Sequence, residues 1–118
     1  MLSIFNSESY MFYKKMLDIG TEKQRIIANN IANVNTPGFK CKDLDFRSEL
    51  RRVLESGSME ELSGVIIKPD NTPIRRDGNN VDLNKEMSSM AKNSIMFKLY
   101  SQLMNRRYRN MKEAMKAV

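Results

Sequence analysis

Three carboxylates in one short stretch are the first candidates for chemistry. Asp43, Asp45 and Glu49 lie close together in the sequence, and such a set can bind a divalent cation or work as a general acid and base. Two lysines and one arginine stand beside or between them. We therefore favour a solvated loop with local ion pairs and assign no catalytic residue to it.

The run Asp77-Gly-Asn-Asn-Val-Asp82 is a second candidate, because it has some likeness to a calcium-binding loop. An EF-hand loop requires glycine at its sixth position, and this run has none there. A turn that leads into a helix cap fits these residues better.

The composition removes most other enzymatic chemistry. Among 118 residues there is no histidine, which excludes a His-dependent triad, an imidazole base and a His metal ligand. The single cysteine, Cys41, can form no intrachain disulfide and no cysteine-based zinc site. Lysines on both sides can lower the pKa of such a thiol, but without a histidine partner we assign it no role. We predict that the protein is not an enzyme and holds no metal and no cofactor. With few aromatics, its core must be aliphatic and rich in methionine.

The formal charge of +6 is concentrated in the C-terminal segment. Residues 85–118 carry eight basic and two acidic side chains, whereas residues 1–84 carry 12 of each. The basic cluster Arg106, Arg107, Arg109, Lys112 and Lys116 fits a nucleic-acid footprint, the solvated face of a helix or an interface to an acidic neighbour. Few aromatics are available to stack bases, so a small basic helical nucleic-acid-binding protein is the alternative function and not our first.

The most regular pattern is a heptad seam that begins at Leu83. Alternate steps of four and three residues meet nine apolar side chains and two serines, which predicts a long helix whose seam needs a partner helix. Asp82 fits the N-cap position of this helix. The seam consists of Leu83, Met87, Met90, Ser94, Phe97, Ser101, Met104, Tyr108, Met111, Met115 and Val118.

A second amphipathic helix is predicted over residues 9–35, where apolar residues recur at helical spacing. Gly20 would allow a local break in it. Asn35-Thr36-Pro37-Gly38 predicts the end of the helix and a type II turn, because the residue before proline disfavours the helical conformation.

Asn29, Asn30 and Asn33 lie at the end of that helix with spacings that can align their amides. Asparagine is a mediocre helix former, so this cluster costs stability unless the amides are used. We expect them to bond across a helix interface and fix its register, as polar seam residues do. The alternative is a frayed last turn.

The predicted fold is mainly α. Helices at 9–35 and 82–118 form an antiparallel coiled-coil hairpin, and residues 36–81 form a loop-rich connector within a single unit, 1–118. The connector is expected to hold extended chain at 39–46, a short helix at 47–56 and a short strand at 65–67, with residues 57–80 least ordered. No run is long and apolar enough to predict a membrane span, and the N-terminus shows no Sec signal pattern.

The run Ile27-Ala-Asn-Asn-Ile-Ala-Asn-Val-Asn-Thr-Pro-Gly-Phe-Lys40 closely resembles the N-terminal signature of bacterial flagellar rod and hook proteins. Segments 41–46, 77–87 and 99–109 are similar to the corresponding parts of the proximal rod members of that family. Phe39 replaces the commoner tyrosine, and Cys41 stands where alanine is frequent.

The resemblance implies a non-enzymatic subunit of the proximal rod, the drive shaft for motility in the flagellar basal body, which crosses the periplasmic space. Family members are exported by the flagellar type III apparatus, and their terminal helices pair on assembly. The implied partners are other copies of the chain, the rod proteins FlgC and FlgF, the adaptor FliE and the membrane ring protein FliF. Neither nucleic acid nor a small-molecule substrate is implied.

We therefore predict assembly residues in place of a catalytic site. The predicted assembly interface comprises Ile27, Asn30, Ile31, Asn33, Val34, Met87, Met90, Phe97, Met104, Tyr108 and Met111. The predicted turn comprises Thr36, Pro37 and Gly38.

Overall fold

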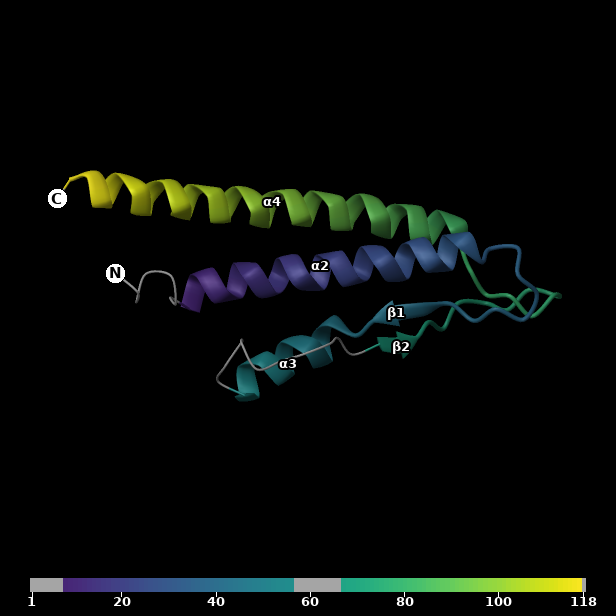
Figure 1. Cartoon of the computed structure of the whole chain (residues 1–118). Helices are drawn as coiled ribbons and strands as arrows, with labels where there is room; N and C mark the ends of the chain where they lie inside the picture. The colour runs from purple at the N-terminus through teal and green to yellow at the C-terminus, as the bar shows by residue number, and fades with distance from the viewer. Residues whose placement is uncertain (1–7, 57–66, 118) are drawn as a thin grey trace.

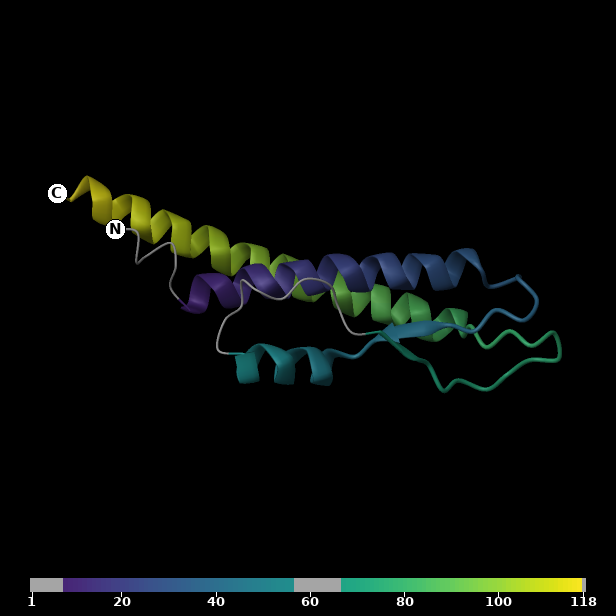
Figure 2. The ribbon, with the colours of Figure 1, turned by 60° about the horizontal axis from the view of Figure 1, so that its bottom comes forward.

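The computed structural model describes residues 8–56 and 67–117. Its elements are α2 (Glu8–Ala32), β1 (Lys42–Leu44), α3 (Phe46–Ser56), β2 (Ile67–Pro69) and α4 (Leu83–Lys116). The two long helices run antiparallel, and the connector folds back along α2 (Figure 1). The molecule measures 67 × 27 × 15 Å, so it is a rod and not a globule (Figure 2). The predicted mainly α hairpin is confirmed.

Helix α2 is continuous through Gly20, so the break that glycine would allow does not occur. Gly20 is buried, and a Cβ at this position would lie 3.3 Å from a ring carbon of Phe97 and 3.7 Å from the amide oxygen of Asn93. The glycine therefore permits a close approach of α4, a packing role that compensates for its low helix propensity.

Helix α4 begins where the sequence predicted. Asp82 is its N-cap, and the side chain accepts a hydrogen bond of 3.2 Å from the backbone N–H of Lys85. The helix has 34 residues and is therefore about 51 Å long. Within residues 8–56 and 67–117, no helix combines the length and the apolar character that crossing a membrane requires.

The connector contains a small antiparallel sheet in which Lys42, Asp43 and Leu44 pair with Pro69, Lys68 and Ile67. The predicted strand at 65–67 is described only at its last residue, and its first two residues lie outside the described part. Residues 57–64, which belong to the segment predicted to be least ordered, also lie outside the described part. Residues 67–80 form β2 and a hydrogen-bonded turn.

The buried core is small and lies where α2 meets α4 and β1. Met16, Ile19, Ile26 and Leu44 form its centre, and Phe12 and Tyr100 pack against it. The core is aliphatic as predicted, but the expectation that it is rich in methionine is wrong. Among the described residues only Met16 of the methionines is buried. Met11 is half-buried on α2, and the others lie on faces of α4 that α2 does not cover or covers in part.

Candidate assembly interface

The end of α2 is closed by Asn79, a residue whose role the sequence pattern did not reveal. Its side chain is completely buried. The amide nitrogen donates to the carbonyl groups of Asn33, Val34 and Thr36 at 2.8, 3.1 and 2.9 Å, and the amide oxygen accepts from the N–H of Val81 at 2.7 Å. One side chain thus bonds to three carbonyl groups of the turn that follows α2.

The turn predicted at Thr36, Pro37 and Gly38 is present. The N–H of Phe39 bonds to the carbonyl of Thr36 at 3.2 Å, and Gly38 has φ of 74°, as the third position of a type II turn requires. The N–H of Gly38 then bonds to the carbonyl of Asp77 at 2.8 Å. This bond joins the turn to the loop before α4.

Gly78 marks the point where these two turns touch. It has φ of 84°, and a Cβ here would lie 3.2 Å from the Cα of Gly38. Glycine is needed at this position both for its conformation and for the close approach. The carboxylate of Asp77 accepts from the N–H of Asn79 at 3.1 Å, so the run 77–82 is a turn and a helix cap, as we favoured over a calcium loop.

Asn30 is 2% exposed, and its amide bonds both to the strand β1 and to the side chain of Glu86 on α4. It donates to the carbonyl of Lys42 at 2.7 Å and accepts from the N–H of the same residue at 3.1 Å. The side chain therefore acts as a hydrogen-bonding neighbour of β1. The bond to Glu86 crosses from α2 to α4, as we expected of an amide at a helix interface. That this amide fixes the register of the two helices stays a prediction.

Asn33 is also used locally. Its amide donates to the carbonyl of Asn29 at 2.8 Å and accepts from the hydroxyl of Thr36 at 3.1 Å. These bonds shape the end of α2 and show that the last turn is ordered and not frayed. A further amide that bridges the two long helices is Asn93 on α4, which donates to the carbonyl of Gly20 at 2.9 Å and to the side chain of Gln24 at 3.1 Å.

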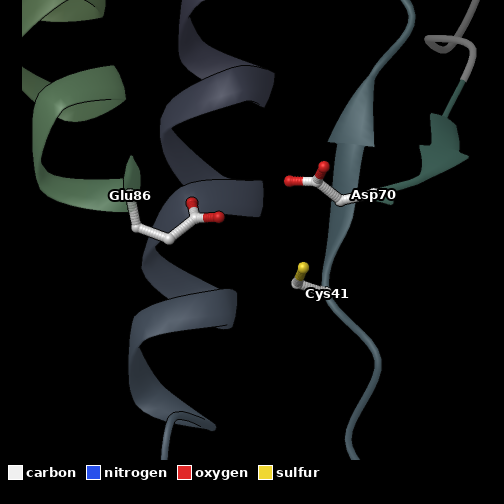
Figure 3. A group of neighbouring side chains, drawn as sticks. All are labelled: Cys41, Asp70 and Glu86. Atoms are coloured by element: carbon white, nitrogen blue, oxygen red, sulfur yellow. The ribbon is translucent and has the colours of Figure 1, made fainter. Parts of the chain in front are cut away.

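Three groups near the base of the hairpin are close enough to hold a metal ion by spacing alone. The ligand atoms of Cys41, Asp70 and Glu86 lie within 4.8 Å of one another, and Figure 3 shows the three side chains facing a common space. The ammonium group of Lys85 already binds both oxygens of Asp70 at 2.6 and 2.7 Å. The thiol donates to the carbonyl of Asn80 at 3.5 Å.

Burial favours the protonated form of two members of this cluster. It raises the pKa of the Cys41 thiol, and the nearby carboxylates Asp70 and Glu86 raise it further. The flanking lysines do not make it reactive, because the side chain is only 1% exposed. Burial likewise raises the pKa of Glu86, against a hydrogen bond from Asn30 that lowers it. Metal ligands must be deprotonated, so both shifts disfavour a metal ion. Since Asp70 binds Lys85 and the thiol binds Asn80, we interpret the cluster as a structural junction.

The carboxylates Asp43, Asp45 and Glu49 are likewise engaged in local structure. Asp45 accepts from the N–H and the hydroxyl of Ser48 at 3.1 and 2.8 Å, and so caps α3. Glu49 is completely buried, and its carboxylate lies 3.1 Å from the ammonium nitrogen of Lys15 on α2. This pair attaches α3 to the hairpin, so the ion pairing expected for this stretch is present. The expected solvated loop is wrong, because the stretch forms β1 and the start of α3 and Glu49 packs against α2.

The side of α4 that holds the predicted seam has three rows of seven-residue spacing, and the seam itself comprises only the middle and outer rows. The inner row faces α2 and consists of Glu86, Asn93, Tyr100 and Arg107, all buried or half-buried. The middle row is half-buried or partly exposed and consists of Leu83, Met90, Phe97, Met104 and Met111. The outer row consists of Met87, Ser94, Ser101, Tyr108 and Met115.

The outer row lies largely in solvent. Met87 is 57% exposed, Tyr108 60% and Met115 44%. Helix α4 is thus rotated about its axis relative to the heptad prediction. The amide of Asn93 and the ring of Tyr100 bring the inner row toward α2. The ring of Tyr100 packs on that of Phe12 at a centroid distance of 6.2 Å. The structure buries only one side of the predicted seam.

The predicted interface residues accordingly fall into two groups. Ile27 and Asn30 are buried, Ile31, Asn33 and Val34 are half-buried, and all five belong to the closed end of α2. Met90, Met104 and Met111 are half-buried on α4, whereas Met87, Phe97 and Tyr108 are exposed.

The segment that contains the turn at Gly38 matches a known protein family. The profile of the family described as Flagella basal body rod protein matches residues 21–40. This stretch covers the second half of α2 and the turn at Gly38, including the buried Asn30.

Similarity to individual proteins extends over most of the chain. The flagellar basal body rod protein FlgB of Salmonella typhimurium is 32% identical over 111 residues, which cover 75% of this chain and 78% of that protein. FlgB of Bacillus subtilis is 32% identical, with coverage of 76% and 79%. FlgB of Proteus mirabilis is 30% identical, with coverage of 87% and 90%. The chain belongs to the FlgB family.

As a member of the FlgB family, the chain is a structural subunit of the bacterial flagellar basal-body rod and not an enzyme. It assembles with other components of the basal body. The predicted function and location are confirmed, and the relatives give no support to the nucleic-acid-binding alternative.

Proposed function

We propose that the outer row of α4 is the surface through which this rod subunit polymerises, with the chain acting as a single unit. The observation that carries this proposal is the exposure of Met87, Tyr108 and Met115 on a helix that already has a partner. Burying each of these side chains against a neighbour would contribute about 1.5–3 kcal/mol.

The serines of the outer row support a helix as the neighbour. Ser94 is exposed and Ser101 is half-buried, and both are small residues between the large side chains of the row. A groove on the same side is lined by Gly20, Ala28, Ser94 and Phe97 among others. Alternate large and small side chains suit the interdigitation of a second helix, so a coiled-coil contact between subunits is the arrangement we expect.

The test is a double substitution, Met87→Ser with Tyr108→Ser, in a strain that carries no other copy of the gene. We expect loss of incorporation into basal bodies and loss of motility, with the thermal midpoint of the purified monomer changed by less than about 3 °C. Ile95→Ser is the matched control, because Ile95 is 67% exposed on α4 outside the three rows. Normal incorporation of the double variant, or equal loss with the control, would refute the proposal.

For the neighbours we propose other copies of this chain, FlgC, FlgF, FliE and FliF, with delivery by the flagellar type III export apparatus. Membership of the FlgB family supports this set. The sole cysteine is buried, so a cysteine introduced by Tyr108→Cys gives a single exposed thiol in the described part of the chain. Cross-linking from it in isolated basal bodies, followed by mass spectrometry, identifies each neighbour directly.

A further inference from the structure

A rod of like subunits needs a contact between two different surfaces. When a surface pairs with its own equivalent on a second copy, the contact closes a two-fold dimer. A contact between unlike surfaces repeats from copy to copy and builds a ring or an open filament. For the outer row to extend a rod of this chain, it must therefore meet a different surface of the next copy.

A second groove, separate from the one beside Ser94, offers such a surface. It lies between α2, α4 and the start of α3, has a volume of about 340 Å³, and is lined by Met16, Ile19, Phe46 and Met96 among others. Phe46 is 42% exposed and Met96 43%, so solvent reaches its apolar walls. Met87 and Met96 are nine residues apart, which is about two and a half turns. The outer row and the second groove therefore lie on opposite sides of α4, and one copy can use both at once.

Two lysines line the second groove, Lys23 on α2 and Lys92 on α4. Lys92 is exposed and Lys23 is half-buried. Among the described residues no carboxylate forms an ion pair with either of them. The groove therefore favours an occupant that combines apolar side chains with negative charge.

The start of α4 has this combination. Leu83 and Met87 are 42% and 57% exposed, and because they are one turn apart they project from the same side of the helix. Asp82 is exposed directly before them. The ammonium group of Lys85 binds both carboxylate oxygens of Asp70 at 2.6 and 2.7 Å, so this lysine does not balance the charge of Asp82.

We propose that the start of α4 in one copy, with Asp82, Leu83 and Met87, docks in the second groove of the next copy. The two apolar side chains enter the groove, and the carboxylate faces the two lysines. The inference rests on the proposed function and deepens it, because it names the surface that receives the first part of the outer row. Each copy gives one surface and receives with the other, so the contact continues along the rod.

The test is disulfide cross-linking in isolated basal bodies. Met87→Cys with Met96→Cys places one thiol on the docking segment and one in the second groove, and a disulfide forms only between Cα atoms within about 7 Å of each other. On mild oxidation we expect a ladder of dimers, trimers and longer covalent chains, because each copy is linked to two others. The native Cys41 is buried, so each single variant should give no cross-link between copies.

Met87→Cys with Ile95→Cys is the matched control, because Ile95 is 67% exposed beside Met96 and does not line the second groove. We expect it to give no ladder. A dimer from Met87→Cys alone would overturn the inference, because it would show that two outer rows pair with each other. Equal cross-linking of the double variant and the control, or no cross-linking of the double variant, would also overturn it. The proposed function is scored separately, by incorporation of the Met87→Ser, Tyr108→Ser variant.

Charge reversal is a second measurement that introduces no cysteine. Lys92→Glu brings like charges together at the groove and should reduce the amount of the chain in basal bodies about fivefold, with the thermal midpoint of the monomer unchanged. Lys14→Glu is the matched control, because Lys14 is exposed on α2 and does not line the second groove. Equal incorporation of the two variants would refute the docking of Asp82 near Lys92 and leave the outer row as the proposed polymerisation surface.

Discussion

The two ends of the helical hairpin differ in how completely the chain satisfies itself. At the connector end, the side chains of Asn79, Asn80 and Asn30 are at most 5% exposed and bond to backbone groups of other elements. At the opposite end, α4 extends alone among the described residues and exposes Tyr108 and Met115. The polar side chains at the connector end are satisfied by hydrogen bonds within the chain, whereas the opposite end exposes apolar side chains that a partner can cover.

With the outer row as the proposed polymerisation surface, separate residues determine the stability of the chain and its assembly. Substitutions at the connector end should lower the free energy of unfolding of the isolated chain, whereas substitutions on the outer row should change it little. The three predictions below examine the connector end, and the outer-row variant proposed above provides the contrast.

The largest effect is expected from Asn79→Ala. The substitution removes a completely buried amide and leaves the carbonyls of Asn33, Val34 and Thr36 without this donor. We expect a loss of about 3 kcal/mol in the free energy of unfolding, measured by urea denaturation followed by circular dichroism. Asn71→Ala, an exposed asparagine in the same connector, is the control and should cost less than about 0.5 kcal/mol. Similar losses in both variants would mean that the closed end is not held by this amide.

The second prediction compares the loss of stability from alanine substitutions at Gly78 and Gly38, whose backbones lie in contact. Gly78→Ala should cost about 2 kcal/mol, because it forces a positive φ on alanine and places a Cβ 3.2 Å from the Cα of Gly38. Gly38→Ala should cost only about 1 kcal/mol, because it imposes the same strain but its Cβ would meet nothing within 4 Å. Thermal melts of the two variants measure the difference. A greater cost for Gly38→Ala would show that contact between the turns is unimportant.

The smallest effect depends on pH and concerns Glu86. Burial raises the pKa of its carboxyl group above the usual value of 4.5, so the folded state holds the proton more tightly than the unfolded state. The stability of the fold therefore falls as the pH rises from about 4.5 through the raised pKa. Glu86→Gln removes this loss, and we expect a gain of up to about 1 kcal/mol at pH 7 and none near pH 4.

The control for this pH dependence is Glu113→Gln, which removes the same charge from an exposed position of α4. Its thermal midpoint should differ little from that of the parent chain at either pH. If Glu86→Gln lowered the midpoint at pH 7, the hydrogen bond with Asn30 would contribute more than burial costs.

The elements of the fold follow from local sequence. Apolar spacing predicts both long helices, Asp82 predicts the start of α4, and Pro37-Gly38 predicts the turn that ends α2. Each of these signals acts within a few residues along the chain, so the sequence displays it directly. The same holds for the concentration of basic charge on the last helix.

The partners of the polar side chains were less predictable. The asparagines near the end of α2 suggested a helix interface, and Asn30 does bond to Glu86 on α4, but it also bonds to β1. The amide that holds the turn after α2 is Asn79, which lies more than 40 residues away in sequence from the carbonyls it binds. The signal that points to it is weak. Two consecutive asparagines follow Gly78 in a turn, and asparagine in such a place has many alternative explanations.

The sequence by itself determined a mainly α rod subunit with a heptad seam, a sharp turn after α2 and a basic C-terminal helix. Only the tertiary structure decided which row of that seam is buried within the chain. A heptad pattern specifies a stripe on a helix but not the rotation at which a neighbour meets it. Asn93, Tyr100 and the close approach at Gly20 fix that rotation, and they leave the outer row exposed.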